Sequence, residues 1–225
     1  MRLASHTTER AIQIPACGST LHGELTLPVG ASGVVLLAGS SLSPEQASGQ
    51  QHIMRALTRG GLGTLLLDIP ATPEHEPTWT ARRHRFDVPL LAERLVCATQ
   101  SVREDAALSG LRVGYYASGA ASTAALVAAA GLADRVSAVV VRGGRPDFAG
   151  AHLARISAAT LLIVGGADRA MIDVSERAYE ELQCVRRLVV VPGATHRFDE
   201  SGALDEVATL ATDWFQLHLE AAVRA

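Results

Sequence analysis

The chain has 225 residues, of which 48% are hydrophobic and 19% charged, and its mean hydropathy is +0.19. A chain this apolar buries ample surface on folding, which excludes an intrinsically disordered protein. The 20 basic and 23 acidic residues give a formal net charge of −3, which argues against nucleic acid and anionic membranes as partners. The three cysteines are scattered without a CxxC pair, which favours neither a disulfide framework nor a zinc site. No apolar run is long enough for a membrane span or a secretion signal, so we expect a cytoplasmic protein.

The apolar pattern predicts strands and helices in alternation. An N-terminal hairpin is expected first, with strands over 11–15 and 21–27. Short β-branched runs then predict strands at 33–38, 63–68, 111–116, 136–141, 160–164 and 187–191. Helix-length stretches are expected between and after them, at about 46–59, 88–108, 119–131, 171–183 and 203–221. This alternation predicts an α/β fold: a mainly parallel sheet of about eight strands, opened by the hairpin and covered by helices on both faces.

We expect residues 1–225 to form one domain, with a core over about 11–221, because no linker-like stretch divides the chain. One segment departs from the pattern: residues 69–86 are polar and rich in proline. They directly follow a predicted strand, and the functional loops of a parallel sheet lie at the carboxyl ends of its strands. The segment is therefore predicted to be a lid or a pocket rim. Its histidines, His75 and His84, would reach the pocket if the segment folds inward.

Three strand ends carry side chains suited to nucleophilic catalysis. Ser118, Asp168 and His196 each follow the end of a predicted strand within a few residues, so all three are expected at one edge of the sheet. Their order in the chain is the order found in α/β-hydrolases. In such a triad the imidazole removes the serine proton, and the carboxylate fixes the imidazole tautomer and stabilises its charged form. The helix expected after Ser118 would offer backbone N–H groups to an oxyanion.

Four segments resemble the small dienelactone-hydrolase-like branch of the α/β-hydrolases. They are FDVPLLAERL at 86–95, VVVRGGRPDFAG at 139–150, TLLIVGGAD at 160–168 and RLVVVPGATH at 187–196. The resemblance extends over nearly the whole chain and is most specific for the fold, for Asp168 and for His196. It implies a serine or cysteine hydrolase that cleaves an ester or lactone and needs neither a cofactor nor a metal.

Two alignments of this chain with the elbow motif are open, one with Gly119 and one with Ser118 at the nucleophile position. The branch has a small-x-Ser-x-small elbow after Gly-Tyr-Phe, where this chain has GYYASGAASTA at 114–124. Aligned without gaps, the nucleophile position falls on Gly119, whose neighbours two residues away are alanines, small enough for the tight turn. Ser118 reaches the apex only if the strand shifts by one residue. Ser122 lies about a turn deeper in the helix.

Backbone N–H groups of Gly119, Gly39 and Ser40 are the expected oxyanion donors. The resemblance implies a His-Gly loop after the first parallel strand, and Gly39 stands at the place of that histidine. Any residue other than proline keeps its N–H, so a donor survives the change. Arg142 and Arg145, at the end of another predicted strand, are candidates for holding a substrate carboxylate. Equally, salt bridges from them would tie their loop to the sheet.

Two functions from different classes follow. The first is a serine hydrolase for a small carboxylic ester or lactone, in which Ser118 attacks the carbonyl, His196 transfers the proton and Asp168 orients His196. Helix N-caps are the structural alternatives for Ser118 and Asp168, and Asp147 is a reserve acid. The second function is a catalytically degenerate hydrolase fold that lost its nucleophile at Gly119 and has a binding or scaffolding role.

Overall fold

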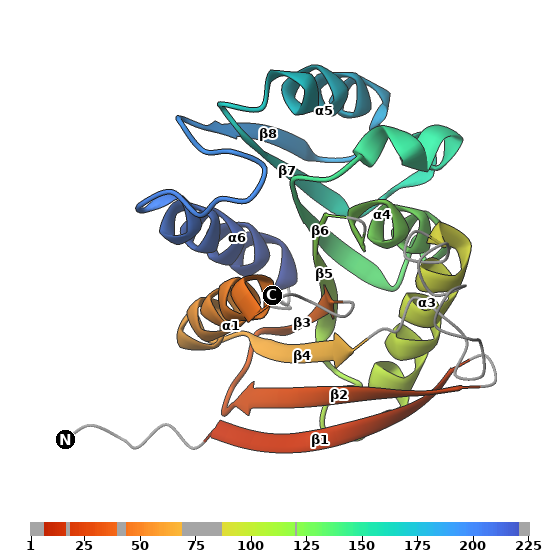
Figure 1. Cartoon of the computed structure of the whole chain (residues 1–225). Helices are drawn as coiled ribbons and strands as arrows, with labels where there is room; N and C mark the ends of the chain where they lie inside the picture. Colours follow the sequence, from red (N-terminus) through yellow and green to blue (C-terminus); the bar gives the residue numbers. More distant parts are fainter. Residues whose placement is uncertain (1–6, 17–18, 40–43, 69–86, 120, 221–225) are drawn as a thin grey trace, which may run out of the picture.

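The predicted apolar runs form an eight-stranded sheet. The structure is a computed structural model, and it describes residues 7–16, 19–39, 44–68, 87–119 and 121–220. The strands are β1 (Thr7–Ala16), β2 (Ser19–Pro28), β3 (Gly33–Gly39), β4 (Gly63–Asp68), β5 (Arg112–Ser118), β6 (Val136–Arg142), β7 (Ala159–Gly165) and β8 (Arg186–Val191). The helices are α1 (Pro44–Arg59), α3 (Val88–Glu104), α4 (Ala121–Gly131), the 3-10 segment η1 (Pro146–Arg155), α5 (Arg169–Glu181) and α6 (Ala203–Leu219). The strand order is β1-β2-β4-β3-β5-β6-β7-β8 (Figure 1). The predicted α/β fold is confirmed.

The pairing of the strands gives the sheet one functional edge. β1 and β2 form the predicted antiparallel hairpin, and β2 pairs antiparallel with β4. All the other pairs, from β4 through β3, β5, β6 and β7 to β8, are parallel. Because parallel strands end at the same edge, the chain after β5, β6, β7 and β8 leaves the sheet on one side.

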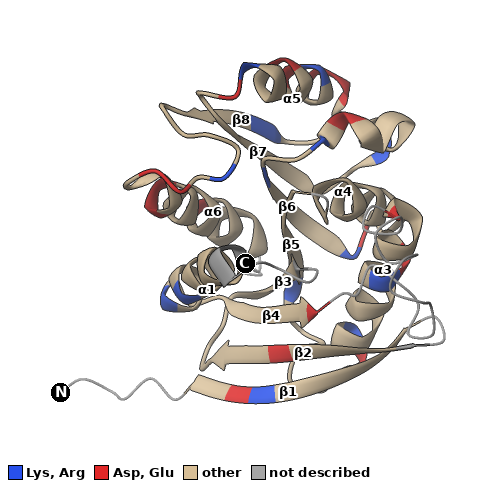
Figure 2. Cartoon of the chain, viewed as in Figure 1, with Lys and Arg blue, Asp and Glu red and all other residues tan. Residues whose placement is uncertain are grey.

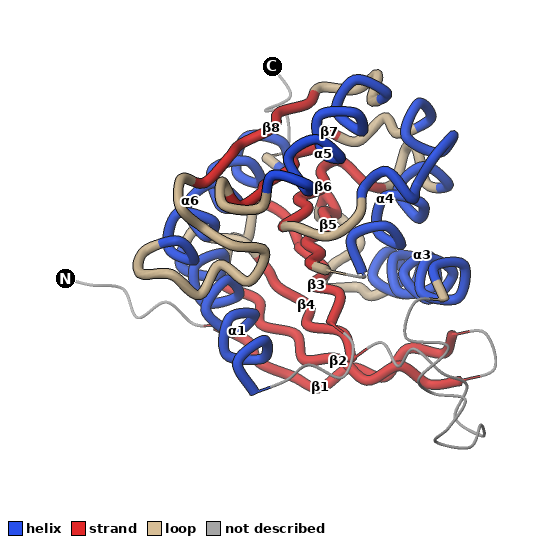
Figure 3. The backbone as a smooth tube through the Cα atoms, turned by 45° about the horizontal axis from the view of Figure 1, so that its top comes forward, coloured by secondary structure: helices blue, strands red, loops and turns tan. Residues whose placement is uncertain are grey.

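Helices cover the sheet on both faces, as predicted. α1 and α6 lie on one face, called here the α1/α6 face, and α3, α4, η1 and α5 lie on the other (Figure 1, Figure 3). Successive side chains of a central strand point to opposite faces. Tyr115 thus packs in the core beside α3, where its hydroxyl meets that of Thr99, while Tyr116 packs in the core of the α1/α6 face. Both faces of the central strands are buried, which explains their unbroken apolar runs.

The segment η1 was not predicted. It begins at Pro146 and has a kink at Gly150, where φ is +50°. Turns this short and interrupted present no sustained helical period in the sequence. Among the described residues, no helix is long and apolar enough to cross a membrane. The predicted lid at 69–86 lies outside the described residues.

Candidate functional site

The loops that carry Asp168 and His196 are hydrogen-bonded to each other. The N–H of Gly166 donates to the carbonyl of Val191 over 2.8 Å, and the N–H of Ala167 donates to that of Ala194 over 2.9 Å. At Gly165, a Cβ atom would lie 2.4 Å from the Ala194 carbonyl oxygen, so this approach requires glycine. The structure therefore brings these two predicted loops together at the carboxyl edge of the sheet.

A two-glycine turn after β6 joins these loops to the end of β5. Gly143 and Gly144 have φ values of +60° and +85°, a backbone conformation that glycine adopts more readily than other residues. A Cβ at Gly144 would lie 2.3 Å from the carbonyl oxygen of Gly119, and one at Gly143 would lie 3.6 Å from that of His196. The turn thus lies between the elbow and the histidine loop.

The bend between β5 and α4 has its apex at Gly119. β5 ends at Ser118 and α4 begins at Ala121, and Gly119 between them has a φ of +58°. A nucleophile elbow is a strained strand-to-helix turn of this kind, with the reacting side chain at the apex. Apart from its chain neighbours, no described residue lies within 4 Å of a Cβ placed at Gly119. Among the described residues the apex therefore has room for a side chain, and glycine supplies none.

Ser118 is the last residue of β5 and lies opposite Arg142 of β6. The alternation of the strand places its side chain on the α1/α6 face, the same face as Tyr116. Ser118 is half-buried. Within the described residues, its hydroxyl has no hydrogen bond to His196 or to any other partner. Its role as the nucleophile stays a prediction.

Asp168 and His196 occupy neighbouring loops without a hydrogen bond between them among the described residues. Asp168 is the N-cap of α5: its Oδ1 accepts a hydrogen bond from the N–H of Met171 over 3.3 Å. His196 is exposed. Their triad roles also stay predictions.

Glu200 was missed by sequence reasoning. Its Oε1 accepts a hydrogen bond of 3.0 Å from the N–H of Thr195, next to His196. Hydrogen bonding to Thr195 holds the pKa of Glu200 below its usual range, and the charge of His196 contributes less. Glu200 follows no strand directly, so the pattern that singled out strand ends gave no signal for it.

Ser122 and Arg145 have structural partners. The Ser122 hydroxyl is fully buried and donates to the carbonyl of Gly143 over 3.2 Å. Arg145 binds the Asp147 carboxylate through Nε at 2.8 Å and Nη2 at 2.6 Å, and its guanidinium stacks on Phe148 at 4.0 Å. Arg145 lowers the pKa of Asp147 through these hydrogen bonds. Arg145 therefore forms a salt bridge within its own segment rather than one that ties the loop to the sheet, and its role toward a substrate stays a prediction.

Among the described residues, no carboxylate pairs with Arg142. Its guanidinium lies over the ring of Phe198, 5.6 Å from the centroid, and its Nε is buried without a hydrogen-bond partner in the part of the chain that the structure describes. Among the predicted oxyanion donors, Gly39 ends β3 opposite Asp68, while Ser40 lies outside the described residues. Within the residues that the structure describes, no group of three His, Cys, Asp or Glu side chains is arranged to hold a metal ion.

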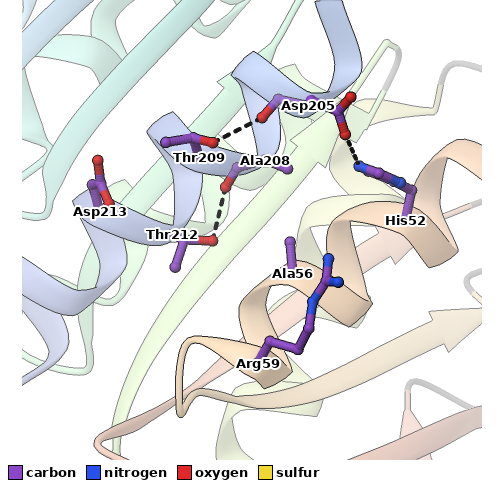
Figure 4. A pocket seen from close by; sticks show the side chains of 8 residues that line it. All are labelled: His52, Ala56, Arg59, Asp205, Ala208, Thr209, Thr212 and Asp213. Carbon is purple, nitrogen blue, oxygen red and sulfur yellow. Dashed lines mark hydrogen bonds and ion pairs between the residues drawn. The ribbon is translucent and has the colours of Figure 1, made fainter. Parts of the chain in front are cut away.

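A separate groove of about 270 Å³ lies between α1 and α6 (Figure 4). It is lined by His52, Ala56, Arg59, Asp205, Ala208, Thr209, Thr212 and Asp213, and Nε2 of His52 pairs with Oδ1 of Asp205 at 2.9 Å. None of the lining residues is a predicted site residue.

In the view of Figure 2, acidic and basic residues are interspersed on the helices and at strand ends.

Comparison with known proteins gives full-length similarity to a hydrolase structure. No family model matches the chain. A dienelactone hydrolase from Anabaena variabilis is 42% identical, with a TM-score of 0.88, over 95% of this chain and 99% of that chain. A cold-adapted esterase from an Arctic intertidal metagenomic library is 15% identical, with a TM-score of 0.74, over 97% of each chain. This esterase supports the fold alone.

The curated relatives are longer proteins. Two proteins from strains of Mycobacterium tuberculosis, provisionally named phosphoribosyl transferases, are 41% identical over 211 residues, which is 94% of this chain. The aligned region is 47% of their length, so the chain spans about half of each relative.

Proposed function

Because the chain belongs to the dienelactone-hydrolase-like branch of the α/β-hydrolases, we propose that it binds a small carboxylic ester or lactone without a serine nucleophile. The observation that carries this proposal is Gly119 at the apex of the elbow, with φ at +58° and, apart from its chain neighbours, no described residue within 4 Å of the place of a Cβ. Hydrolysis by a triad needs a hydroxyl at that apex, within reach of both the imidazole and the substrate carbonyl. Glycine has no such group.

The other polar groups at the carboxyl edge of the sheet would bind the carbonyl oxygen of such a ligand. The N–H of Gly119 stands at the entry to α4, where the helix dipole and unpaired N–H groups favour a negatively polarised oxygen. The loop that begins at Gly39 and Ser40 is the proposed second donor. His196 and Asp168 then act as polar groups that orient the ligand, and no cofactor enters this binding.

Hydrolysis through Ser118 is the second candidate, and it is supported by the 42% identity to a dienelactone hydrolase over nearly all of both chains. A shift of β5 by one residue would put Ser118 at the apex. Its Oγ would then attack the carbonyl, His196 would take the proton and later give it to the leaving oxygen, and Asp168 would stabilise the imidazolium. Backbone N–H groups of Gly119 and the Gly39 loop would hold the oxyanion.

A fluorophosphonate probe followed by peptide mapping separates the two candidates, because the probe reacts with activated serines. We expect the folded wild-type chain to stay unlabelled, as would a Ser118→Ala variant. In parallel, γ-butyrolactone and methyl acetate are titrated into the protein and followed by amide NMR shifts. Saturable shifts without turnover support binding. Labelling at Ser118 that disappears in Ser118→Ala would establish the second candidate instead.

A further inference from the structure

We propose that the free edge of β8 pairs with β8 of a second copy of this chain, antiparallel and across a two-fold axis, so that the two sheets continue into each other. The free edge is the side of β8 that faces away from β7, where the order of the described strands ends. In Figure 1, β8 and the neighbouring α5 form one end of the molecule. Such self-association goes beyond the proposed function and does not depend on it.

The backbone of β8 has open hydrogen-bonding groups along this edge. The carbonyl oxygens of Val185 and Val191 each accept a hydrogen bond of 2.8 Å from N–H groups in and directly after β7. Because the backbone groups of successive strand residues point to alternate sides, Arg186, Leu188 and Val190 direct theirs to the free edge. No other described strand pairs with them. An open row of this kind is a template for a further strand.

The side chains of β8 are mostly apolar and only partly covered. All seven residues of β7 are buried, whereas in β8 Val191 alone is buried. Val190 is 40% exposed, and Val185, directly before the strand, is 63% exposed. Exposed apolar side chains beside open backbone groups favour burial against a partner.

The other outer strand, β1, shows how an edge is protected from such pairing. Glu9 and Arg10 stand exposed on it, and so does Pro15, which has no N–H to donate. Charges and proline on an outer strand oppose pairing with another chain. From Leu188 to Val191, β8 has neither. The two edges of the sheet therefore differ, and β8 is the one left open to a partner.

The sequence of β8 is complementary to itself in one antiparallel register. The register that pairs every free group places the two-fold axis beside Leu188, which then lies opposite Leu188 of the second copy. Arg186 lies opposite Val190 of the second copy, and Arg187 lies opposite Val189. Directly opposed like charges would destabilise the pair, and this register contains none.

Arg186 gives the two copies complementary charges. Its Nε is buried without a hydrogen-bond partner, and no carboxylate of the described residues forms an ion pair with it. Its guanidinium lies over the ring of Tyr179 at 4.9 Å, so Tyr179 marks the side of α5 that lies over β8. Glu176, three residues earlier, shares that side and is exposed. The two α5 helices flank the line along which the strands pair, called here the seam, and each offers Glu176 to Arg186 of the other copy.

The same side of α5 also has apolar side chains that enlarge the contact. Ile172 lies seven residues, or two helical turns, before Tyr179, and both side chains are half-buried. Two α5 helices along the seam would cover them together with Val190. A second copy is the occupant that fits this edge, because it supplies both the complementary strand and the acidic helix.

Sedimentation velocity over a concentration series of the whole chain tests the pairing. We expect the wild type to dimerise. Val190→Lys places a lysine opposite Arg186 of the second copy, so it should raise the Kd of the dimer by about tenfold or more. Val29→Lys is the matched control, because Val29 is 78% exposed in the turn after β2, and it should dimerise like the wild type. A wild type that is monomeric up to about 1 mM would leave the edge to a strand of another protein and overturn the second copy as its occupant.

A charge exchange tests the contact across the seam. Arg186→Glu should raise the Kd by about tenfold or more, because it puts a carboxylate beside Glu176 of the second copy. Adding Glu176→Arg to Arg186→Glu should restore most of the affinity. Dimers that tolerate both Val190→Lys and Arg186→Glu would show that another surface pairs, which contradicts the proposal.

Amide hydrogen exchange locates the contact without relying on variants that have to fold. The N–H of Leu188 faces the free edge, so it should exchange more slowly in concentrated than in dilute wild-type protein, by the factor that the dimer fraction sets. The amides of β1 should exchange at the same rate in both samples. Equal rates for Leu188 at the two concentrations, in a sample that sedimentation shows to be dimeric, would refute pairing through β8.

Discussion

Replacing Gly119 with serine is expected to install a nucleophile in this domain. The elbow turn is already formed, because Gly119 has the positive φ of an apex residue at +58°. Apart from its chain neighbours, no described residue lies within 4 Å of a Cβ there, so a serine side chain fits among the residues that the structure describes. The new hydroxyl would stand above the carboxyl edge, on the side of the sheet from which the His196 loop also leaves. A wild type that fluorophosphonate does not label should therefore become labelled at residue 119.

The cost of the Gly119→Ser change in stability follows from the backbone. An L-residue in the left-handed region costs about 1–2 kcal/mol relative to its preferred conformation. Losing the freedom of glycine in the unfolded chain returns about 0.4–1 kcal/mol. The free energy of unfolding should fall by about 1 kcal/mol, which lowers Tm by about 2–4 °C for a domain of this size.

Two controls make the Gly119→Ser result decisive. Gly119→Ala bears the same backbone strain without a hydroxyl, so it should show the same fall in Tm and no labelling. Adding His196→Gln to Gly119→Ser should slow labelling by about 100-fold or more, because the general base is lost. A folded Gly119→Ser protein that fluorophosphonate does not label, and that does not hydrolyse p-nitrophenyl acetate, would refute the assignment of Gly119 to the apex.

Three further changes test how the edge is held together. Gly144→Ala should destabilise the protein in urea by about 1–3 kcal/mol more than Gly193→Ala. Both positions have positive φ, but only a Cβ at Gly144 meets a carbonyl oxygen, at 2.3 Å, so equal losses would contradict the close approach. Asp147→Asn should cost up to about 1 kcal/mol at neutral pH. Since Arg145 lowers the pKa of Asp147 in the folded state, this stability is present above the ordinary pKa of 3.8 and lost as pH falls below it. Urea unfolding at neutral and acidic pH should show the gap between wild type and variant closing in acid. Asp168→Ala should cost about 0.5–2 kcal/mol through loss of the α5 N-cap, and a variant as stable as wild type would show that the cap contributes nothing.

The strands were predictable because burial on both faces leaves continuous apolar runs. The run over 160–164 became β7 at Ala159–Gly165, a difference of one residue at each end. The helix expected over 88–108 instead ends at Glu104. There the Asp105 carboxylate accepts a hydrogen bond from the N–H of Ala107 over 2.9 Å and pairs with Arg10 of β1. The apolar period continues past this point, but a side-chain turn and a contact distant in sequence end the helix.

The site was predictable in its position but not in its internal contacts. Strand ends indicated the edge where Ser118, Asp168 and His196 lie, because parallel strands share a direction. The approach of Gly144 to the elbow carbonyl depends on the path of two loops in space. The same holds for Arg142, whose place over the Phe198 ring depends on the path of the loop after β8.

A nucleophile must stand at the apex of the elbow, above the sheet, with its hydroxyl turned to an imidazole. In the observed register Ser118 pairs with Arg142 on the strand and Gly119 makes the bend, so Ser118 does not meet this demand. A one-residue shift of β5 would bring Ser118 to the apex, but it would move Tyr116 out of its place in the core of the α1/α6 face. Fluorophosphonate labelling at Ser118 is therefore expected only if β5 leaves the observed register.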